Sequence, residues 1–440
     1  MEQRKYTQDG RLIFTKEMKR DYTLLMPQML PVTFTLLRRV FELYGYKAEM
    51  LDTSHRGIVD TGLKYVHNDT CFPALLVIGQ LIDAVQSGKY DVNKIALMIT
   101  QTGGGCRASN YIHLLRKALE KAGLSFIPVV SLNLSGLEKN PGFKLTIPML
   151  MKLAFAMIYG DFIMWLANQV KPYELTKGDA DLVISSWTEN IIKMLDDGKA
   201  MSKKSMRVVL AEIAADFAAV PREVTDKPRV GIVGEIYVKF SPLGNNNLED
   251  FLLAEGCEVV VPGLTDFMIF KINNRSADVE LYRGNIFKKL LCDVAQSYLA
   301  GLQDIMIEAV KTQPGFRPMG RFSDLKRLIK GYLGYGNKMG EGWLLTAEML
   351  ELIHTGAGNI VCTQPFGCLP NHVVGKGMIR RLKDDYPESN IVAIDYDPGA
   401  TRINQENRIK LMIANAGRLG KNAPGTVPAQ RGDYAAAETV

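Results

Sequence analysis

The residues best suited to chemistry in this chain of 440 residues are its six cysteines. Cys71 opens an expected helix in NDTCFPALLVIGQ, whereas Cys106 in QTGGGCRASNY and Cys368 in QPFGCLPNH each lie between an expected strand and a helix. A helix N-terminus stabilises negative charge and lowers the pKa of a thiol, so these positions favour thiolate ligands. We therefore expect Cys71, Cys106 and Cys368 to bind metal, although spacing alone leaves catalysis and plain burial open.

The other three cysteines are weaker candidates for metal ligands. Cys362 ends an expected strand shortly before Cys368, so its thiol points either into the core or into a crevice. Cys257 begins a strand and Cys292 lies on a helix, where a free cysteine behaves as a small apolar residue. Cys362 is therefore a possible fourth ligand. Three thiolates around one four-iron cluster would leave an iron open to a substrate.

A glycine run, Gly103, Gly104 and Gly105, directly precedes Cys106. Its backbone amides can form a nest that binds an anion, such as cluster sulfide or phosphate, although a tight turn explains the run equally well. The run does not match the P-loop, and no GxxxxGK[ST] occurs elsewhere in the chain. We expect that this chain does not hydrolyse ATP itself.

Three further residues are candidates for acid or base chemistry. His67 precedes Cys71, and His372 follows Cys368, so either can donate to a cluster sulfide or protonate a substrate. Glu235 lies near the end of an expected strand in GIVGEIYVKFSP, at another crevice position. The alternatives are a helix-capping or surface role for each histidine and a solvated loop for Glu235.

The elements that would position these residues alternate along the chain. Expected strands at 22–27, 47–51, 94–100 and 126–132 are separated by helical patterns at 31–46, 71–85 and 109–122. Strict alternation predicts right-handed crossovers and a mainly parallel sheet. In such sheets, the loops after the strands line the crevice where ligands bind.

The later sequence repeats this alternation after a helical stretch. Expected strands lie at 229–238, 257–263, 359–364 and 390–397. We therefore expect an α/β protein of two Rossmann/flavodoxin-like parallel-sheet domains with a helical insertion and the cluster in the crevice between the domains. The expected division is a first α/β domain at 1–146, a helical bridge at 147–225, a second α/β domain at 226–422 and a disordered tail at 423–440.

The charge and hydropathy of the chain limit the classes of partner and the cellular location that we expect. The net charge of +6 is spread along the chain without a polybasic tract, so we expect no nucleic-acid partner. The polar N-terminus lacks the apolar core of a secretory signal, which predicts a cytoplasmic protein. The apolar stretch at 147–170 contains Lys152, Asp161 and Asn168, so we expect a buried helix and no membrane association.

Four long segments resemble one known family. HNDTCFPALLVIGQ, MITQTGGGCRASNYIHLLRKAL, SLNLSGLEKNPGFKLT and CTQPFGCLPNHVVGKGMIRRLK are similar to the acyl-CoA dehydratase activase-related branch of the 2-hydroxyacyl-CoA dehydratase superfamily, which also includes benzoyl-CoA reductase and double-cubane cluster proteins. The similarity extends from about Phe14 to Leu419. In many relatives of this branch, the region follows a part that resembles an activator ATPase, which the present sequence lacks.

The resemblance implies an oxygen-sensitive iron-sulfur protein. By resemblance, Cys71, Cys106 and Cys368 carry a 4Fe-4S cluster, and Cys362 remains a possible ligand. An 8Fe-9S double cubane would also recruit Cys257 and Cys292, so a single cubane is favoured.

The resemblance also implies partners and two alternative functions. The partners would be a separate activator ATPase with its own cluster, a CoA-thioester substrate, and a second subunit in a homodimer or heterodimer. The chain would then either reduce or dehydrate the thioester with a low-potential electron, or act as a reductase or electron relay without dehydratase activity.

Overall fold

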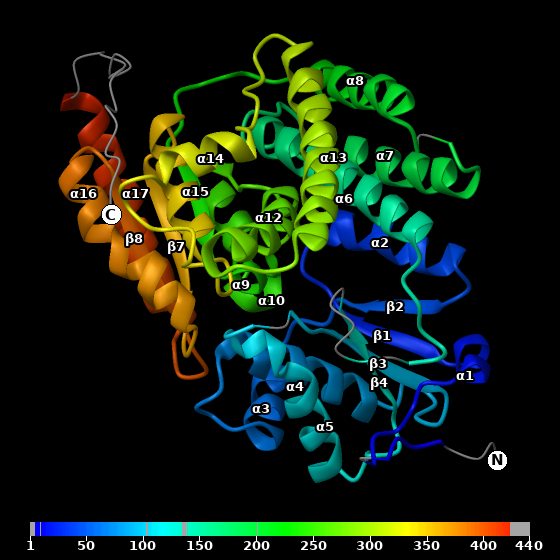
Figure 1. Cartoon of the computed structure of the whole chain (residues 1–440). Coiled ribbons are helices and arrows are strands. Elements are labelled where there is room, and N and C mark those ends of the chain that lie inside the picture. The colour runs from blue at the N-terminus through cyan, green and yellow to red at the C-terminus, as the bar shows by residue number, and fades with distance from the viewer. Residues whose placement is uncertain are drawn as a thin grey trace.

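The chain forms two α/β lobes, each built on a four-stranded parallel sheet (Figure 1). This computed structural model describes residues 5–8, 10–102, 104–133, 138, 140–199 and 201–422, with side chains as far as residue 416. The expected α/β architecture with two parallel-sheet domains is confirmed. The predicted disorder of residues 423–440 falls outside the described residues.

The first lobe contains the sheet drawn in blue and cyan in Figure 1. Its strand order is β2-β1-β3-β4, and every pair is parallel. Its elements, in chain order, are α1 (Lys16–Asp21), β1 (Thr23–Pro27), α2 (Pro31–Leu43), β2 (Lys47–Leu51), α3 (Arg56–Tyr65), α4 (Phe72–Gln86), β3 (Ile95–Thr100), the 3₁₀ turn η1 (Arg107–Ser109), α5 (Tyr111–Lys121) and β4 (Val129–Leu132).

The second lobe repeats this order as β6-β5-β7-β8, again with parallel pairs throughout. Its elements are β5 (Arg229–Gly234), α9 (Ile236–Phe240), α10 (Pro242–Asn245), α11 (Leu248–Ala254), β6 (Glu258–Val260), α12 (Leu264–Tyr282), α13 (Ile286–Lys311), α14 (Phe322–Leu328), α15 (Trp343–His354), β7 (Asn359–Pro365), the π-helix η2 (Asn371–Gly375), η3 (Lys376–Met378), α16 (Ile379–Asp385), β8 (Asn390–Tyr396) and α17 (Arg402–Asn422).

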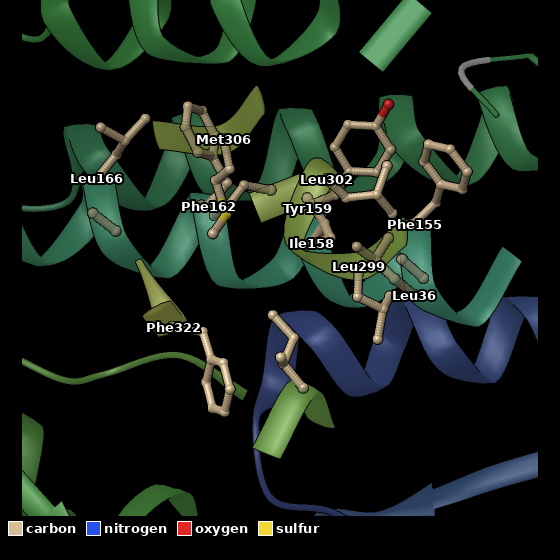
Figure 2. Packing of buried hydrophobic residues seen from close by; sticks show 14 of the residues in the cluster. Leu36, Phe155, Ile158, Tyr159, Phe162, Leu166, Leu299, Leu302, Met306 and Phe322 are labelled. Carbon is tan, nitrogen blue, oxygen red and sulfur yellow. The ribbon is translucent and has the colours of Figure 1, made fainter. Parts of the chain in front are cut away.

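Three helices lie between the two sheets in sequence: α6 (Ile147–Val170), α7 (Asp179–Asp196) and α8 (Lys203–Ala219). Thr146 caps α6 by accepting from the backbone N–H of Met149, and Pro148 fits its first turn. The helix contacts α2 of the first lobe and β6, α12 and α13 of the second. Figure 2 shows Phe155, Tyr159 and Phe162 of α6 within the cluster of buried side chains to which α13 also contributes.

The helix α6 is also the single helix in the described part of the chain that is long and apolar enough to cross a membrane. More than half of its apolar window, 56%, is buried inside the protein. Asp161, in the middle of this helix, is 2% exposed and hydrogen-bonded to Thr265. These contacts agree with the buried helix that we expected.

The strand predicted at 229–238 is the clearest error in the element boundaries. β5 ends at Gly234, because the side chain of Glu235 accepts from the backbone N–H of Val238 and starts α9 there. The apolar run that follows Glu235 therefore belongs to a buried helical turn. This correction brings Glu235 to the exact end of a strand.

Candidate functional site

The expected ligands lie where the strand order of each sheet reverses. In both sheets the first strand lies between the second and the third, so the carboxyl ends of β1 and β3, and of β5 and β7, flank a topological switch point. Cys106 follows β3, Cys368 follows β7 and Glu235 follows β5. Cys71 approaches from another direction, as the residue that precedes α4.

Two backbone contacts bring the cysteine loops of the two lobes together. The N–H of Phe72, next to Cys71, donates to the carbonyl of Phe366 at 2.9 Å. Gly367 has a φ of +72°, and a Cβ atom there would lie 3.0 Å from the Cα of Cys71. Only glycine permits both the backbone angle and this close approach without strain.

The third cysteine joins through a loop that precedes α15. A Cβ atom on Gly340, whose φ is +60°, would lie 3.9 Å from the Sγ of Cys106 and 3.1 Å from Pro370. Pro370 follows Cys368 by two residues and directly precedes η2. Cys71, Cys106 and Cys368 therefore face one region between the lobes.

Burial decides the protonation of these three thiols. It raises the pKa of Cys71, raises that of Cys106 to about 11 and raises that of Cys368 still further. Opposing this, the backbone N–H groups at the starts of the following helices, on Ala74, Ala108 and Asn371, lower the three pKa values. The lowered pKa expected from the helix N-termini is therefore outweighed, and the thiols stay protonated until a cation compensates the charge.

The three thiols also act on one another. The charge of Cys71 raises the pKa of Cys106, and the charge of Cys106 raises the pKa of Cys368. Each of the three also feels Glu235. Such mutual effects require the four groups to be close, so the cysteines and Glu235 form one electrostatic unit, which we call the cysteine site.

Two buried carboxyl groups bind the first turn of α9. Glu235 Oε2 accepts from the N–H of Val238 at 2.9 Å, and Glu341 Oε1 accepts from the N–H of Ile236 at 3.0 Å. Burial, followed by the charge of Glu341, raises the pKa of Glu235 to about 8. Burial likewise raises the pKa of Glu341. Glu235 is thus a buried carboxyl, and the solvated loop that we considered is wrong.

Sequence reasoning missed three residues of this site. The hydroxyl of Tyr111 lies 3.1 Å from the Sγ of Cys71, and Lys271 Nζ donates to the carbonyl of Gly340 at 2.5 Å. Glu341 and Cys106 both act to raise the pKa of Lys271, although burial lowers it overall. Tyr111 follows Cys106 in the quoted motif, and Glu341 lies in the glycine-rich GYLGYGNKMGEG. These two local patterns could have drawn attention to both residues.

The structure does not bring the other cysteines into this group. Cys362 is fully buried on β7, where its Sγ lies 3.7 Å from Asn371 Oδ1, and burial raises the pKa of this thiol to about 12. Cys257 is also fully buried, and Cys292 is partly exposed on α13. Cys362 therefore lies among core residues, so of the two directions that its position allowed, core or crevice, its thiol takes the core.

The remaining candidates lie at the periphery. Both histidines are exposed, and His67 has a side chain that is 70% exposed and contacts Asp69. Gly103 lies outside the described residues, and the N–H of Gly105 donates to the sulfur of Met339 at 3.0 Å. The described part of the glycine run therefore contacts a side chain of the second lobe.

The donor set fits a cluster better than a single ion. Within the described ranges, no group of three or more His, Cys, Asp or Glu side chains is close enough to hold one metal ion. A four-iron cluster takes each cysteine on a different iron, so its ligands lie further apart. The buried Cys71 and Cys368 and the partly buried Cys106 come from two lobes and match that requirement.

No protein-family model matches this chain, and a search of curated proteins finds no match. The resemblance of the four segments therefore stays a prediction.

Proposed function

We propose that this chain is an iron-sulfur protein of the 2-hydroxyacyl-CoA dehydratase type, with Cys71, Cys106 and Cys368 as the ligands of a 4Fe-4S cluster. The observation that carries the proposal is the convergence of three cysteines, of which Cys71 and Cys368 are buried and Cys106 is partly buried, from loops that enter helices in the two lobes. Thiolates are the usual ligands of such clusters. The cluster, when bound, supplies a low-potential electron for reduction or dehydration of a CoA thioester.

The residues around the thiols have separate tasks in this proposal. Tyr111 is 8% exposed, and its pKa is raised well above 10, mainly by burial, so it remains a neutral donor beside Cys71. Lys271 contributes a positive charge near Cys106 and Glu341. Together these groups offset part of the negative charge that thiolates and sulfides place in a buried site.

Glu235 is the strongest candidate for a proton donor. Its Oε2 already accepts from Val238, so a proton resides on Oε1. A pKa of about 8 keeps this carboxyl largely protonated at neutral pH and still able to release its proton, which is what general acid catalysis needs. His67 and His372 remain alternatives, but both side chains are exposed.

The proposal also includes partners and a location. A separate activator ATPase with its own cluster, as the source of the electron, is proposed by analogy with the family that the chain resembles. A cytoplasmic location and a homo- or heterodimeric assembly are part of the same proposal, by analogy with the family that the chain resembles.

The proposal is tested on anaerobically purified protein reduced with titanium(III) citrate, which replaces the activator. Iron and acid-labile sulfide are measured first, and the protein is then incubated with a panel of 2-hydroxyacyl-CoA thioesters. We expect iron, sulfide and formation of an enoyl-CoA, detected by mass spectrometry. A preparation without iron or sulfide contradicts the proposal, and a stable cluster that turns over no thioester favours the electron relay.

A further inference from the structure

A cavity of about 270 Å³ lies in the second lobe, apart from the cysteine site. It is enclosed by α6, the start of α12, the ends of α13 and α15, and the segment 317–320. None of the residues of the cysteine site lines it. Since a cavity of about 150 Å³ already accepts a benzene-sized molecule, this one accepts a ligand of amino-acid size.

Three carboxyl groups line the cavity. Asp161, Asp266 and Glu351 line it, and these three carboxyl groups form no ion pair with any residue that the structure describes. Asp161 is only 2% exposed. Its Oδ2 accepts from Thr265, whereas its Oδ1 has no hydrogen-bond partner. A buried carboxylate oxygen without a partner is costly, which indicates a missing donor.

The nearest cation does not supply that donor. Lys239 is bound to both carboxylate oxygens of Glu348, at 3.0 and 3.1 Å. Burial and neighbouring carboxylates raise the pKa of Asp266 to about 7 and that of Glu351 well above its usual range. The raised pKa values favour the protonated carboxyls, so the feature that calls for a donor here is the unpaired Oδ1 of Asp161. An ammonium group would supply that donor and favour the charged form of the neighbouring carboxyls.

Two guanidinium groups also line the cavity. Arg229 and Arg317 both bind the same oxygen of Glu258, so two guanidinium groups share one carboxylate. The Nε of Arg317 is buried without a hydrogen-bond partner. Arg229 is partly buried, and its pKa is lowered by desolvation and by the charge of Arg317. This pair has an excess of positive charge that an anionic group would neutralise.

Apolar side chains complete the lining, and Arg317 is held in place. Met164, Trp165, Met306 and Met319 line the cavity. The indole N–H of Trp165 and the amide of Gln169 donate to the carbonyl of Arg317 at 2.7 and 3.1 Å, and the N–H of Arg317 donates to Gln169 at 2.8 Å. The backbone of Arg317 is therefore fixed on α6, and its side chain, 43% exposed, lies at the mouth.

We propose that this cavity binds a small zwitterion, with a primary ammonium group at Asp161, Asp266 and Glu351, a carboxylate at Arg317 and Arg229, and a short carbon chain against Trp165 and the methionines. A metal ion does not fit, because the described residues contain no group of three such side chains close enough to hold one. An amine without an anionic group would leave the guanidinium excess uncompensated. The proposal does not depend on the iron-sulfur cluster.

Isothermal titration calorimetry on the full chain tests this with ω-amino acids from glycine to 6-aminohexanoate, each compared with the alkylamine and the carboxylic acid of matching length. We expect one amino acid to bind with a Kd of about 1 mM or tighter, the weak end of specific binding. Its matched amine and acid should bind at least about tenfold more weakly, a loss of about 1.4 kcal/mol each.

Two variants and a control locate the site. Glu351→Gln and Arg317→Met should each weaken binding at least tenfold, whereas Glu189→Gln, an exposed position on α7, should not change it. Circular dichroism melting confirms that each variant is folded, and if one is not, the other carries the test. Absence of binding by every amino acid, equal binding of a matched amine, or unchanged binding in both folded variants overturns the proposal.

Discussion

The two sheets have the same strand order but different chemistry at their switch points. The loops of the first lobe supply Cys71 and Cys106, whereas those of the second supply one thiol, Cys368, together with the buried carboxyl groups of Glu235 and Glu341. The same topology thus brings loops of both lobes to one place, and the loop sequences decide what those loops do. In the proposed function, the first lobe is mainly a source of ligands, and the second lobe adds the proton donor.

The lobes also differ in whether their carboxyl groups away from solvent have ion-pair partners. In the first lobe, Glu138 forms ion pairs with Arg116 at 2.6 Å and with Arg11 at 3.2 Å. In the second lobe, Lys239 is the partner of Glu348, while the buried Asp266 and Glu341 and the partly buried Glu351 have no ion pair among the residues described. The second lobe therefore stores unfavourable electrostatic energy, which is typical of regions that bind ligands.

Removal of a ligand from either lobe should give the largest effect. Alanine at Cys71, Cys106 or Cys368 should abolish the cluster, because each thiol would bind a different iron and no spare thiol lies in the cysteine site. Alanine at Cys292, which is partly exposed on α13, should leave the cluster in place. Iron and acid-labile sulfide after anaerobic purification measure the result. Loss of iron in Cys292→Ala but not in Cys71→Ala would overturn the ligand assignment.

The next effect should come from the buried ion pair of the second lobe. Lys239→Met leaves Glu348 buried and unpaired, and breaking such a pair costs about 3–5 kcal/mol of the free energy of unfolding. Urea denaturation of the metal-free chain measures it. Lys199→Met, which breaks the exposed pair with Asp197, should have little effect. Equal effects in the two variants would show that the second lobe does not depend on buried charge.

The contact between the lobes predicts a smaller loss. Gly367 has a φ of +72° and Gly88 a φ of +77°. Alanine at either position must adopt this positive φ, which should lower the free energy of unfolding by about 1–2 kcal/mol. Only at Gly367 does the added Cβ also meet the backbone of Cys71. Gly367→Ala should therefore lower iron content as well as stability, whereas Gly88→Ala should lower stability alone. Full iron content in Gly367→Ala would mean that the lobes do not need this close approach.

A further effect should be a difference in pH dependence between the lobes. The pKa of Asp266 is raised from 3.8 to about 7, so between these values the folded chain holds a proton that the unfolded chain has lost. Stability then falls as pH rises, by up to about 1.4 kcal/mol per pH unit, and Asp266→Asn should flatten this slope.

Glu138 in the first lobe should behave in the opposite way. Burial raises its pKa, but the ion pair with Arg116 outweighs that effect and lowers the pKa below 4.5. Its contribution is present above that value and is lost as pH falls, so Glu138→Gln should change only the acidic side of the stability profile. Urea denaturation across the pH range compares the two variants. Identical profiles would refute the difference between the lobes.

The sequence predicted the architecture well, because apolar runs and helix signals are local. The strand at 47–51 was placed exactly, and the alternation of strands and helices indicated both parallel sheets. The three cysteines were found for the same reason, since helix starts are visible in a sequence. The direction of Cys362 was not predictable, because β7 is buried along almost its whole length and shows no alternation between faces.

The rest of the cysteine site depends on contacts between distant segments. Glu341 and Lys271 come from a glycine-rich loop and from the middle of α12, and no local pattern links either to Cys106. The cavity is formed by segments that lie far apart in the sequence, so it was missed for the same reason. Long-range packing also produces the raised pKa values, which helix position alone had predicted to be lowered.

Electron paramagnetic resonance of the anaerobically purified, dithionite-reduced chain tests the central claim most directly. We predict the spectrum of one reduced 4Fe-4S cluster per chain, with about four irons and four sulfides, that disappears in Cys368→Ala. Because Cys368 is the only thiol that the second lobe contributes among the described residues of the cysteine site, its loss separates a cluster held by both lobes from one held by the first lobe alone. A reduced protein with no iron-sulfur signal, or with the same signal after removal of Cys368, would contradict the account.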